Sequence, residues 1–258
     1  VTYLYFDIPD AEQIVSRRYP TFSHLGADGS GVDVVIGNHV ESIRQYTFSD
    51  YVNLKSLTFE AGSVCTEIDE GAFTDYNKEY GELSSLSGEL RLPSSIKKIG
   101  AGAFAETSIT SLVIPEGVEE IGAMAFQHCG KLARVEYNAV NAATPYYGNG
   151  SCFDYSGCNV GGFDLVIGSK VEVIGNGLFN MGYDEKMGPE WGVGGLKSLT
   201  LPTPCNLRTI GKDTFSGNSL LTGKIDIPSS VETIGDGAFS GCRLITDVVV
   251  PSTVTSVG

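Results

Sequence analysis

The chain contains residue types that could do chemistry, but their spacing matches no familiar catalytic or metal-binding pattern. Its 258 residues include six cysteines and three histidines, without a Cys-x-x-Cys, His-x-x-x-His or His-Glu-x-x-His sequence. The usual ligand spacings of a zinc site are therefore absent. No serine stands in the Gly-x-Ser-x-Gly sequence typical of many hydrolases. The histidines fall at unrelated positions, and we interpret each as a surface residue: His24, His39 and His128.

Two acidic pairs, Glu119–Glu120 and Asp69–Glu70, are the remaining candidates for catalysis. Two carboxylates can act as the acid and the base of a glycosidase. Both pairs stand in turn positions of a repeat described below, where solvated charge is their ordinary role. We therefore predict that the chain is not an enzyme and binds no metal or cofactor.

The cysteines are predicted to be structural. Cys129 and Cys242 each stand three residues after a repeated Phe, and Cys65 replaces a repeated Val, so all three should be buried as small hydrophobic side chains. Cys129 and Cys242 lie about five repeat units apart, ~24 Å at the spacing of neighbouring strands, too far for a disulfide. Cys152 and Cys158 are close in sequence. A disulfide between them would suit an exported protein, but the sequence leaves this open.

The chain contains a short sequence repeat, and the strands and turns of this repeat determine where the cysteines, histidines and acidic pairs lie. An Ile is followed five residues later by a Phe in seven places, and an apolar residue precedes each Ile by three positions. Gly follows the Ile in five of the seven. The pairs are Ile43/Phe48, Ile68/Phe73, Ile99/Phe104, Ile121/Phe126, Ile174/Phe179, Ile210/Phe215 and Ile234/Phe239.

Upstream of each pair stands an apolar-x-apolar triplet, usually closed by Pro or Gly. Such a triplet predicts a short strand with two inward side chains, which Pro or Gly then ends. The Val-x-x-Ile segment should form the opposite wall, and Ile-Gly-x-x-Ala-Phe should turn the chain back with Phe inside. Stacked units share a core that one unit cannot bury alone. Nine triplets begin at Val34, Leu57, Leu90, Leu112, Val135, Leu165, Leu199, Ile225 and Val248.

The full pattern is read most clearly at 112–129 (LVIPEGVEEIGAMAFQHC) and at 225–242 (IDIPSSVETIGDGAFSGC). It resembles the BspA-like (Treponema pallidum-type) leucine-rich repeats over nearly the whole chain from about residue 34. The resemblance implies a β-rich leucine-rich-repeat solenoid, a right-handed coil with short parallel strands on one face and 3₁₀ or short helical turns elsewhere. It also implies secreted or surface-anchored proteins, mostly of host-associated bacteria, that adhere to host matrix proteins or other cells without catalytic residues.

We expect one solenoid over residues 1–258. It should contain about nine repeats, each of roughly 22–24 residues, with irregular insertions. Residues 1–33 are predicted to form an irregular first repeat, 34–134 regular repeats, 135–163 an irregular repeat with a long insertion, and 164–258 repeats of which the last is truncated. We interpret residues 1–37 and 135–168 as counterparts because each opens with Val-x-Tyr and resumes with similar sequence. This predicts two copies of a four- to five-unit block.

Insertions at 74–87, 138–163 and 180–195 interrupt the period and are rich in aromatic residues. Long loops in a compact domain are often functional, and exposed Tyr and Trp provide large contact areas at low entropic cost. The alternative is that these side chains pack onto the solenoid and fill gaps. The predicted partner-binding residues are Trp191, Tyr183, Tyr146, Tyr147, Phe153 and Tyr155.

The middle residue of each triplet should point outward and form a ladder along one face. Its mixed composition, without an aromatic stripe, favours neither an anionic partner nor a stacked sugar. The ladder consists of Val35, Thr58, Arg91, Val113, Glu136, Val166, Thr200, Asp226 and Val249.

The formal net charge of −14 disfavours nucleic acid and anionic lipid as partners, and no apolar run is long enough to insert into a membrane. We predict an extracellular or cell-surface monomer that binds an extracellular protein or glycan. The alternative function is a rigid spacer in a larger surface protein. The absence of a polar terminal cap favours a longer parent protein.

Overall fold

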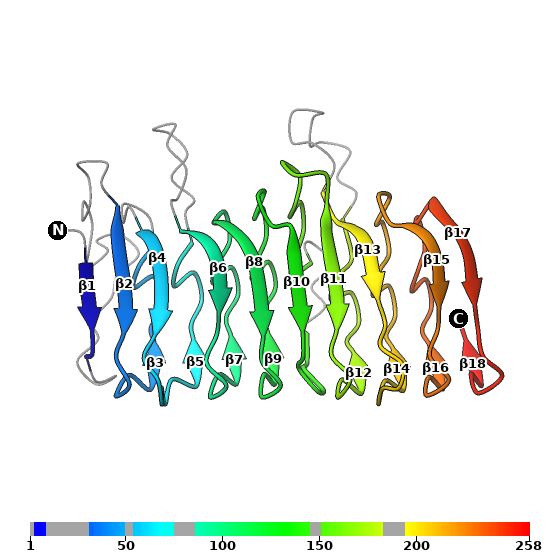
Figure 1. Cartoon of the computed structure of the whole chain (residues 1–258), viewed down its shortest axis with the longest axis horizontal. Helices are drawn as coiled ribbons and strands as arrows, with labels where there is room; N and C mark the ends of the chain where they lie inside the picture. Colours follow the sequence, from blue (N-terminus) through cyan, green and yellow to red (C-terminus); the bar gives the residue numbers. More distant parts are fainter. Residues whose placement is uncertain (1–2, 9–30, 50–53, 75–85, 145–150, 183–193) are drawn as a thin grey trace.

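The computed structural model describes residues 3–8, 31–49, 54–74, 86–144, 151–182 and 194–258. In these residues the chain forms strands and turns without a helix, and all paired strands are parallel. The strands follow one another in sequence order along an elongated stack (Figure 1). This is the predicted leucine-rich-repeat solenoid. No helix within these ranges is long and apolar enough to cross a membrane.

One wall of the solenoid consists of the longer strands, which pair in the orders β1-β2-β4, β6-β8-β10-β11-β13 and β15-β17. In neighbouring strands the predicted triplets lie opposite one another, for example Leu112 opposite Val135 and Leu165 opposite Leu199. The strands are β1 (Tyr3–Phe6), β2 (Val32–Ile36), β4 (Leu54–Phe59), β6 (Ser87–Arg91), β8 (Ser108–Ile114), β10 (Arg134–Tyr137), β11 (Phe163–Ile167), β13 (Leu196–Thr200), β15 (Thr222–Asp226) and β17 (Leu244–Val249).

The second wall consists of two-residue strands at the predicted Val-x-x-Ile segments. They form the sheets β3-β5-β7-β9 and β12-β14-β16-β18, and most of their Ile side chains are buried. These strands are β3 (Ser42–Ile43), β5 (Glu67–Ile68), β7 (Lys98–Ile99), β9 (Glu120–Ile121), β12 (Val173–Ile174), β14 (Thr209–Ile210), β16 (Thr233–Ile234) and β18 (Ser256–Val257).

The alternating triplets and the glycine-rich turns account for both walls. In β8, Leu112 and Ile114 are buried, while Val113 between them is half-buried on the outer face. The segment after each short strand turns through hydrogen bonds three residues apart, such as Ala103 N–H to the Gly100 carbonyl (N···O 3.3 Å). This is the hydrogen-bond spacing of a 3₁₀ turn.

A ladder of phenylalanine rings runs through the core, and we call it the Phe ladder. Neighbouring rings have centroids 5.0–6.0 Å apart and are nearly parallel. Phe153 stacks between Phe126 and Phe179, with both centroid distances 5.1 Å, and is fully buried. The prediction that Phe153 contacts a partner is therefore wrong. The ladder consists of Phe48, Phe73, Phe104, Phe126, Phe153, Phe179, Phe215 and Phe239.

The alignment of residues 1–37 with residues 135–168 is wrong by three residues at the first strand. Leu4 of β1 lies opposite Val34, as Val135 of β10 lies opposite Leu165. Leu4, and not Val1, is therefore the counterpart of Val135. The shift in numbering from Leu4 to Val135 is the same as the shift from Val34 to Leu165, so the two strand pairs are equivalent.

The residue three positions after a ladder Phe can form a hydrogen bond with the backbone of the preceding unit. Cys129 Sγ donates to the Phe104 carbonyl at 3.3 Å, and Ser156 Oγ donates to the Phe126 carbonyl at 2.6 Å. Small side chains with a donor therefore add hydrogen bonds to carbonyl groups of the buried turns and join neighbouring units. The predicted burial of Cys129 and Cys65 is confirmed, whereas Cys242 is partly buried against the core.

Cys152 occupies the core position that precedes a ladder Phe, where Ala72, Ala103 and Ala125 stand in other units. Cys158 is partly exposed, and no disulfide joins the two residues. Burial raises the pKa of the Cys129 and Cys152 thiols to about 12.

We expect iodoacetamide to modify Cys158 and Cys205 before Cys129 and Cys152 in the native chain, because Cys158 and Cys205 are partly exposed. Cys129 and Cys152 should react only after unfolding, since alkylation requires an accessible thiolate. Mass spectrometry of native and urea-unfolded samples measures this difference. Equal rates at all six cysteines in the native chain would contradict the assigned burial.

Candidate binding surface

Two regions are candidate binding surfaces: the base of the insertions and the outward face of the long strands. Of the predicted binding residues, Tyr146, Tyr147, Tyr183 and Trp191 lie outside the described residues. The described residues that flank these insertions are Thr144, Ser151, Gly182 and Gly194, and we call them the insertion base.

One buried carboxylate links two residues of the insertion base, Ser151 and Gly182. Asp154 is 4% exposed and accepts hydrogen bonds from the Ser151 N–H and the Gly182 N–H, both at 2.8 Å. The next segment adds a third link, because Gly195 N–H donates to the Ser156 carbonyl at 2.8 Å. The segment 151–156 is therefore hydrogen-bonded to both Gly182 and Gly195.

Tyr155 lies between these anchors and is half-buried. Its ring meets the His128 ring edge-on, with centroids 5.0 Å apart. His128 Nδ1 in turn contacts the Glu106 carboxylate, and both side chains are only about one-tenth exposed. All three residues follow a ladder Phe by two positions and have φ angles between 55° and 65°. The structure describes two of the predicted binding residues, Phe153 and Tyr155. Phe153 is buried, so only Tyr155 of these two has a partly exposed side chain.

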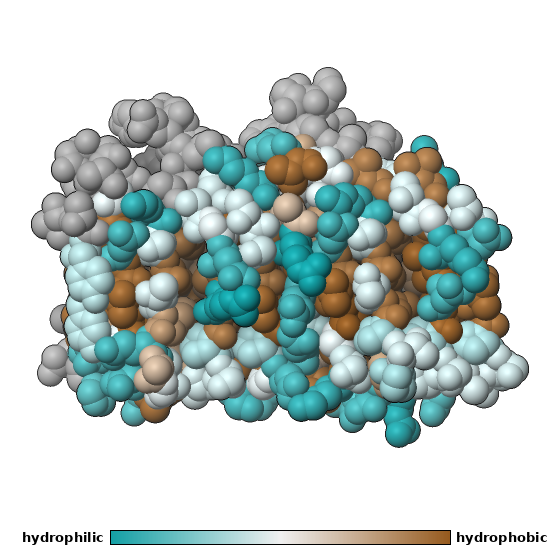
Figure 2. Space-filling model, in the orientation of Figure 1, coloured by the Kyte–Doolittle hydropathy of each residue, from teal (hydrophilic) through white to brown (hydrophobic). Residues whose placement is uncertain are grey.

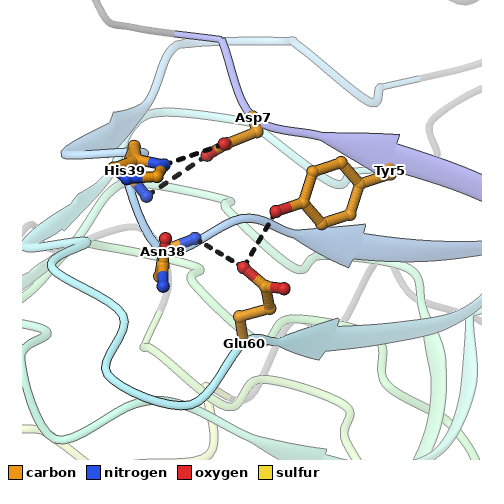
Figure 3. A network of polar contacts seen from close by, with 5 residues as sticks. All are labelled: Tyr5, Asp7, Asn38, His39 and Glu60. Atoms are coloured by element: carbon orange, nitrogen blue, oxygen red, sulfur yellow. Dashed lines mark hydrogen bonds and ion pairs between the residues drawn. The ribbon is translucent and has the colours of Figure 1, made fainter.

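The outward strand face carries a polar network at its N-terminal end, which the sequence analysis did not identify. Tyr5 Oη donates to Glu60 Oε2 at 2.9 Å, and the same oxygen accepts the Asn38 N–H at 3.1 Å. Asp7 binds His39 through the backbone N–H at 3.2 Å and the imidazole Nδ1 at 2.9 Å. Figure 3 shows these side chains meeting where β1, β2 and β4 end.

The pKa shifts in this network follow from its hydrogen bonds. The hydrogen bond to Glu60, partial desolvation and the charges of Asp7 and Glu60 raise the pKa of Tyr5 to about 12. The hydrogen bond with His39 lowers the pKa of Asp7, and the same bond raises the pKa of His39. At neutral pH Tyr5 is therefore a neutral phenol in a negative local field.

The remaining outward face is mixed, as predicted. Arg91 and Glu89 form an ion pair at 2.8 Å, and Lys224 and Asp226 form another at 2.6 Å. Figure 2 shows hydrophobic and hydrophilic side chains interspersed along this side of the molecule. Exposed ion pairs of this kind contribute little binding energy by themselves.

One residue of each acidic pair considered for catalysis forms an ordinary surface contact. Glu119 forms an ion pair with Lys97 at 2.9 Å, and Glu70 accepts a hydrogen bond from Tyr46 Oη at 2.6 Å. Across the described ranges, no group of three His, Cys, Asp or Glu side chains is arranged to hold a metal ion.

Comparison with known proteins identifies the repeat. The family model described as a BspA type leucine rich repeat region matches in six copies, over residues 30–137, 80–183 and 192–258. No curated protein matches the chain.

Three solved structures of bacterial proteins are similar at low identity. One is a leucine rich cell surface protein from Faecalibacterium prausnitzii, with 19% identity, coverage of 97% of this chain and 82% of that chain, and a TM-score of 0.33. The pneumococcal vaccine antigen PcpA has 18% identity, coverage of 100% and 74%, and a TM-score of 0.38. A leucine-rich repeat protein from Bacteroides ovatus has 18% identity, coverage of 99% and 83%, and a TM-score of 0.37.

Proposed function

The chain belongs to the BspA-type leucine-rich repeat family, and on that premise we propose that it is a non-enzymatic binding module of a bacterial cell surface. Its partner is an extracellular protein or glycan, and adhesion is its role. The aromatic insertions Tyr146–Tyr147 and Tyr183–Trp191 make the contact, with Tyr155 beside them.

The observation that carries this proposal is the buried Asp154 at the insertion base. A buried carboxylate is costly unless it is hydrogen-bonded, and Asp154 makes its bonds to Ser151 and Gly182, the residues that flank the two insertions. A rigid base reduces the entropy lost when loops bind a partner. Tyr and Trp side chains are enriched in binding hot spots.

The test is binding of the full chain to an array of extracellular-matrix proteins and glycans, alongside a Trp191→Ala/Tyr146→Ala/Tyr147→Ala variant. We expect saturable binding that weakens at least about tenfold in the variant, since a hot-spot residue contributes about 2 kcal/mol or more. Asp154→Asn should weaken binding less, because it loosens the base but keeps the rings. Binding that is equal in the wild type and the triple variant would exclude the insertions as the contact.

The Phe ladder favours a second candidate function, a stiff spacer. It runs without a gap from Phe48 to Phe239, and stacked units of this kind resist bending because each unit packs on both neighbours. A chain that binds nothing across a broad array would favour this function over adhesion.

A further inference from the structure

The first strand gives the outward face two exposed aromatic rings. Tyr3 and Tyr5 are 54% and 45% exposed, and they point to the same side because side chains two residues apart in a strand share a face. They lie on the first long strand, at the N-terminal end of the row of outward-facing side chains. The corresponding outward positions of the other described long strands hold no aromatic side chain.

Acidic residues lie beside Tyr5 and on the strand next to Tyr3. Asp33 lies opposite Tyr3 in the pairing of β1 with β2, while Glu60 is hydrogen-bonded to the phenol of Tyr5. Asp7 follows two residues after Tyr5 on the same face. Among the described residues, His39 binds Asp7, and Lys55 stands on β4.

We propose that this tyrosine–carboxylate face (Tyr3, Tyr5, Asp7, Asp33 and Glu60) binds an arginine- or lysine-bearing segment of a partner protein. A cation over a tyrosine ring is attracted by the negative face of the π system. Neighbouring carboxylates strengthen that attraction and can accept the hydrogen bonds of a guanidinium or ammonium group. An anionic partner would be repelled by the same charges and by the net charge of −14.

The second half of the chain provides an internal comparison. By the equivalence of β1 and β10, Arg134 and Glu136 of β10 replace Tyr3 and Tyr5, and Asn138 replaces Asp7. There Asn138 Nδ2 donates to Glu136 Oε1 at 3.2 Å. The same backbone therefore carries an aromatic, acidic face in one half and a mixed polar face in the other. The difference lies in the side chains that would recognise a cation.

The test measures binding of an octa-arginine peptide to the full chain, with an octa-glutamine peptide of equal length as the uncharged probe. Octa-arginine should bind with an affinity that falls as salt is added, and octa-glutamine should not bind. A Tyr3→Ala/Tyr5→Ala variant should bind octa-arginine about five- to thirtyfold more weakly, since each exposed cation–π contact contributes about 0.5–1 kcal/mol.

Matched variants separate this site from general charge attraction and from unfolding. Tyr3→Phe/Tyr5→Phe keeps both rings and should retain most of the affinity, whereas Glu60→Gln should weaken binding several-fold. Glu136→Ala in the second half should leave the affinity unchanged, as should the triple insertion variant, because the inference does not depend on the insertions.

Three outcomes would overturn the proposal: no binding of octa-arginine to the wild type, equal binding by the Tyr3→Ala/Tyr5→Ala variant, or an equal loss caused by Glu136→Ala. Thermal unfolding of each variant accompanies the titrations. If the alanine variant has unfolded, the comparison of Glu60→Gln with Glu136→Ala decides the question.

Discussion

Replacing Phe126 with alanine should lower the free energy of unfolding by about 3–5 kcal/mol, the usual cost of removing a buried phenylalanine. Phe126 is fully buried and stacks on Phe104 at 5.6 Å and on Phe153 at 5.1 Å. The substitution removes a link from the middle of the Phe ladder. In a repeat protein, stability depends on contacts between neighbouring units, so the two halves should unfold less cooperatively.

Urea denaturation followed by circular dichroism measures both effects. Phe239→Ala is the matched control, because Phe239 is only partly buried and contacts one ladder ring, that of Phe215 at 5.2 Å. Its cost should be clearly smaller. A loss below about 1 kcal/mol for Phe126→Ala would contradict the ladder as a main source of stability.

Replacing Asn218 with alanine should cost about 2–4 kcal/mol, the penalty for leaving buried backbone groups unpaired. Asn218 is fully buried, and its Nδ2 donates to the Phe179 carbonyl at 2.8 Å and the Phe215 carbonyl at 2.9 Å. Its Oδ1 accepts the Leu196 N–H at 2.7 Å. One side chain thus joins the strand β13 to two turns of the Phe ladder.

Asn218→Ser is the matched control for this prediction. The equivalent position of an earlier unit holds Ser156, whose Oγ binds the carbonyl of the preceding unit. A serine should recover part of the stability lost in Asn218→Ala, but it cannot also accept the Leu196 N–H at the position of Oδ1. Equal stability of the wild type and Asn218→Ala would show that these hydrogen bonds contribute nothing net to folding.

The sequence was sufficient to predict the regular units, because period, inward side chains and turn residues agree at each of them. The irregular unit was different. Gly148, and not an Ile, stands five residues before Phe153, and the wall below Phe153 includes buried Ala139 and Ala142 in place of the usual Val and Ile. A search based on Ile followed by Phe therefore missed the stacking of Phe153, and the ring was interpreted as part of a binding loop.

The position of the first strand within the irregular first repeat was misassigned for a related reason. In Tyr3-Leu4-Tyr5-Phe6 both the inward and the outward side chains are large and apolar, so the alternation that reveals a half-buried strand is hidden. The polar network depends on Tyr5 and Glu60, which are 55 residues apart. Only the pairing of β1 with β2 and of β2 with β4 brings them together.

Attachment of bacteria that display the full chain tests the proposed adhesive role most directly. Non-adherent cells that carry the chain should attach to a surface coated with the extracellular partner found by the array. Cells that carry the Trp191→Ala/Tyr146→Ala/Tyr147→Ala variant at the same surface density should attach no better than cells without the chain. Equal attachment by the wild type and the variant would contradict an adhesive contact through the insertions.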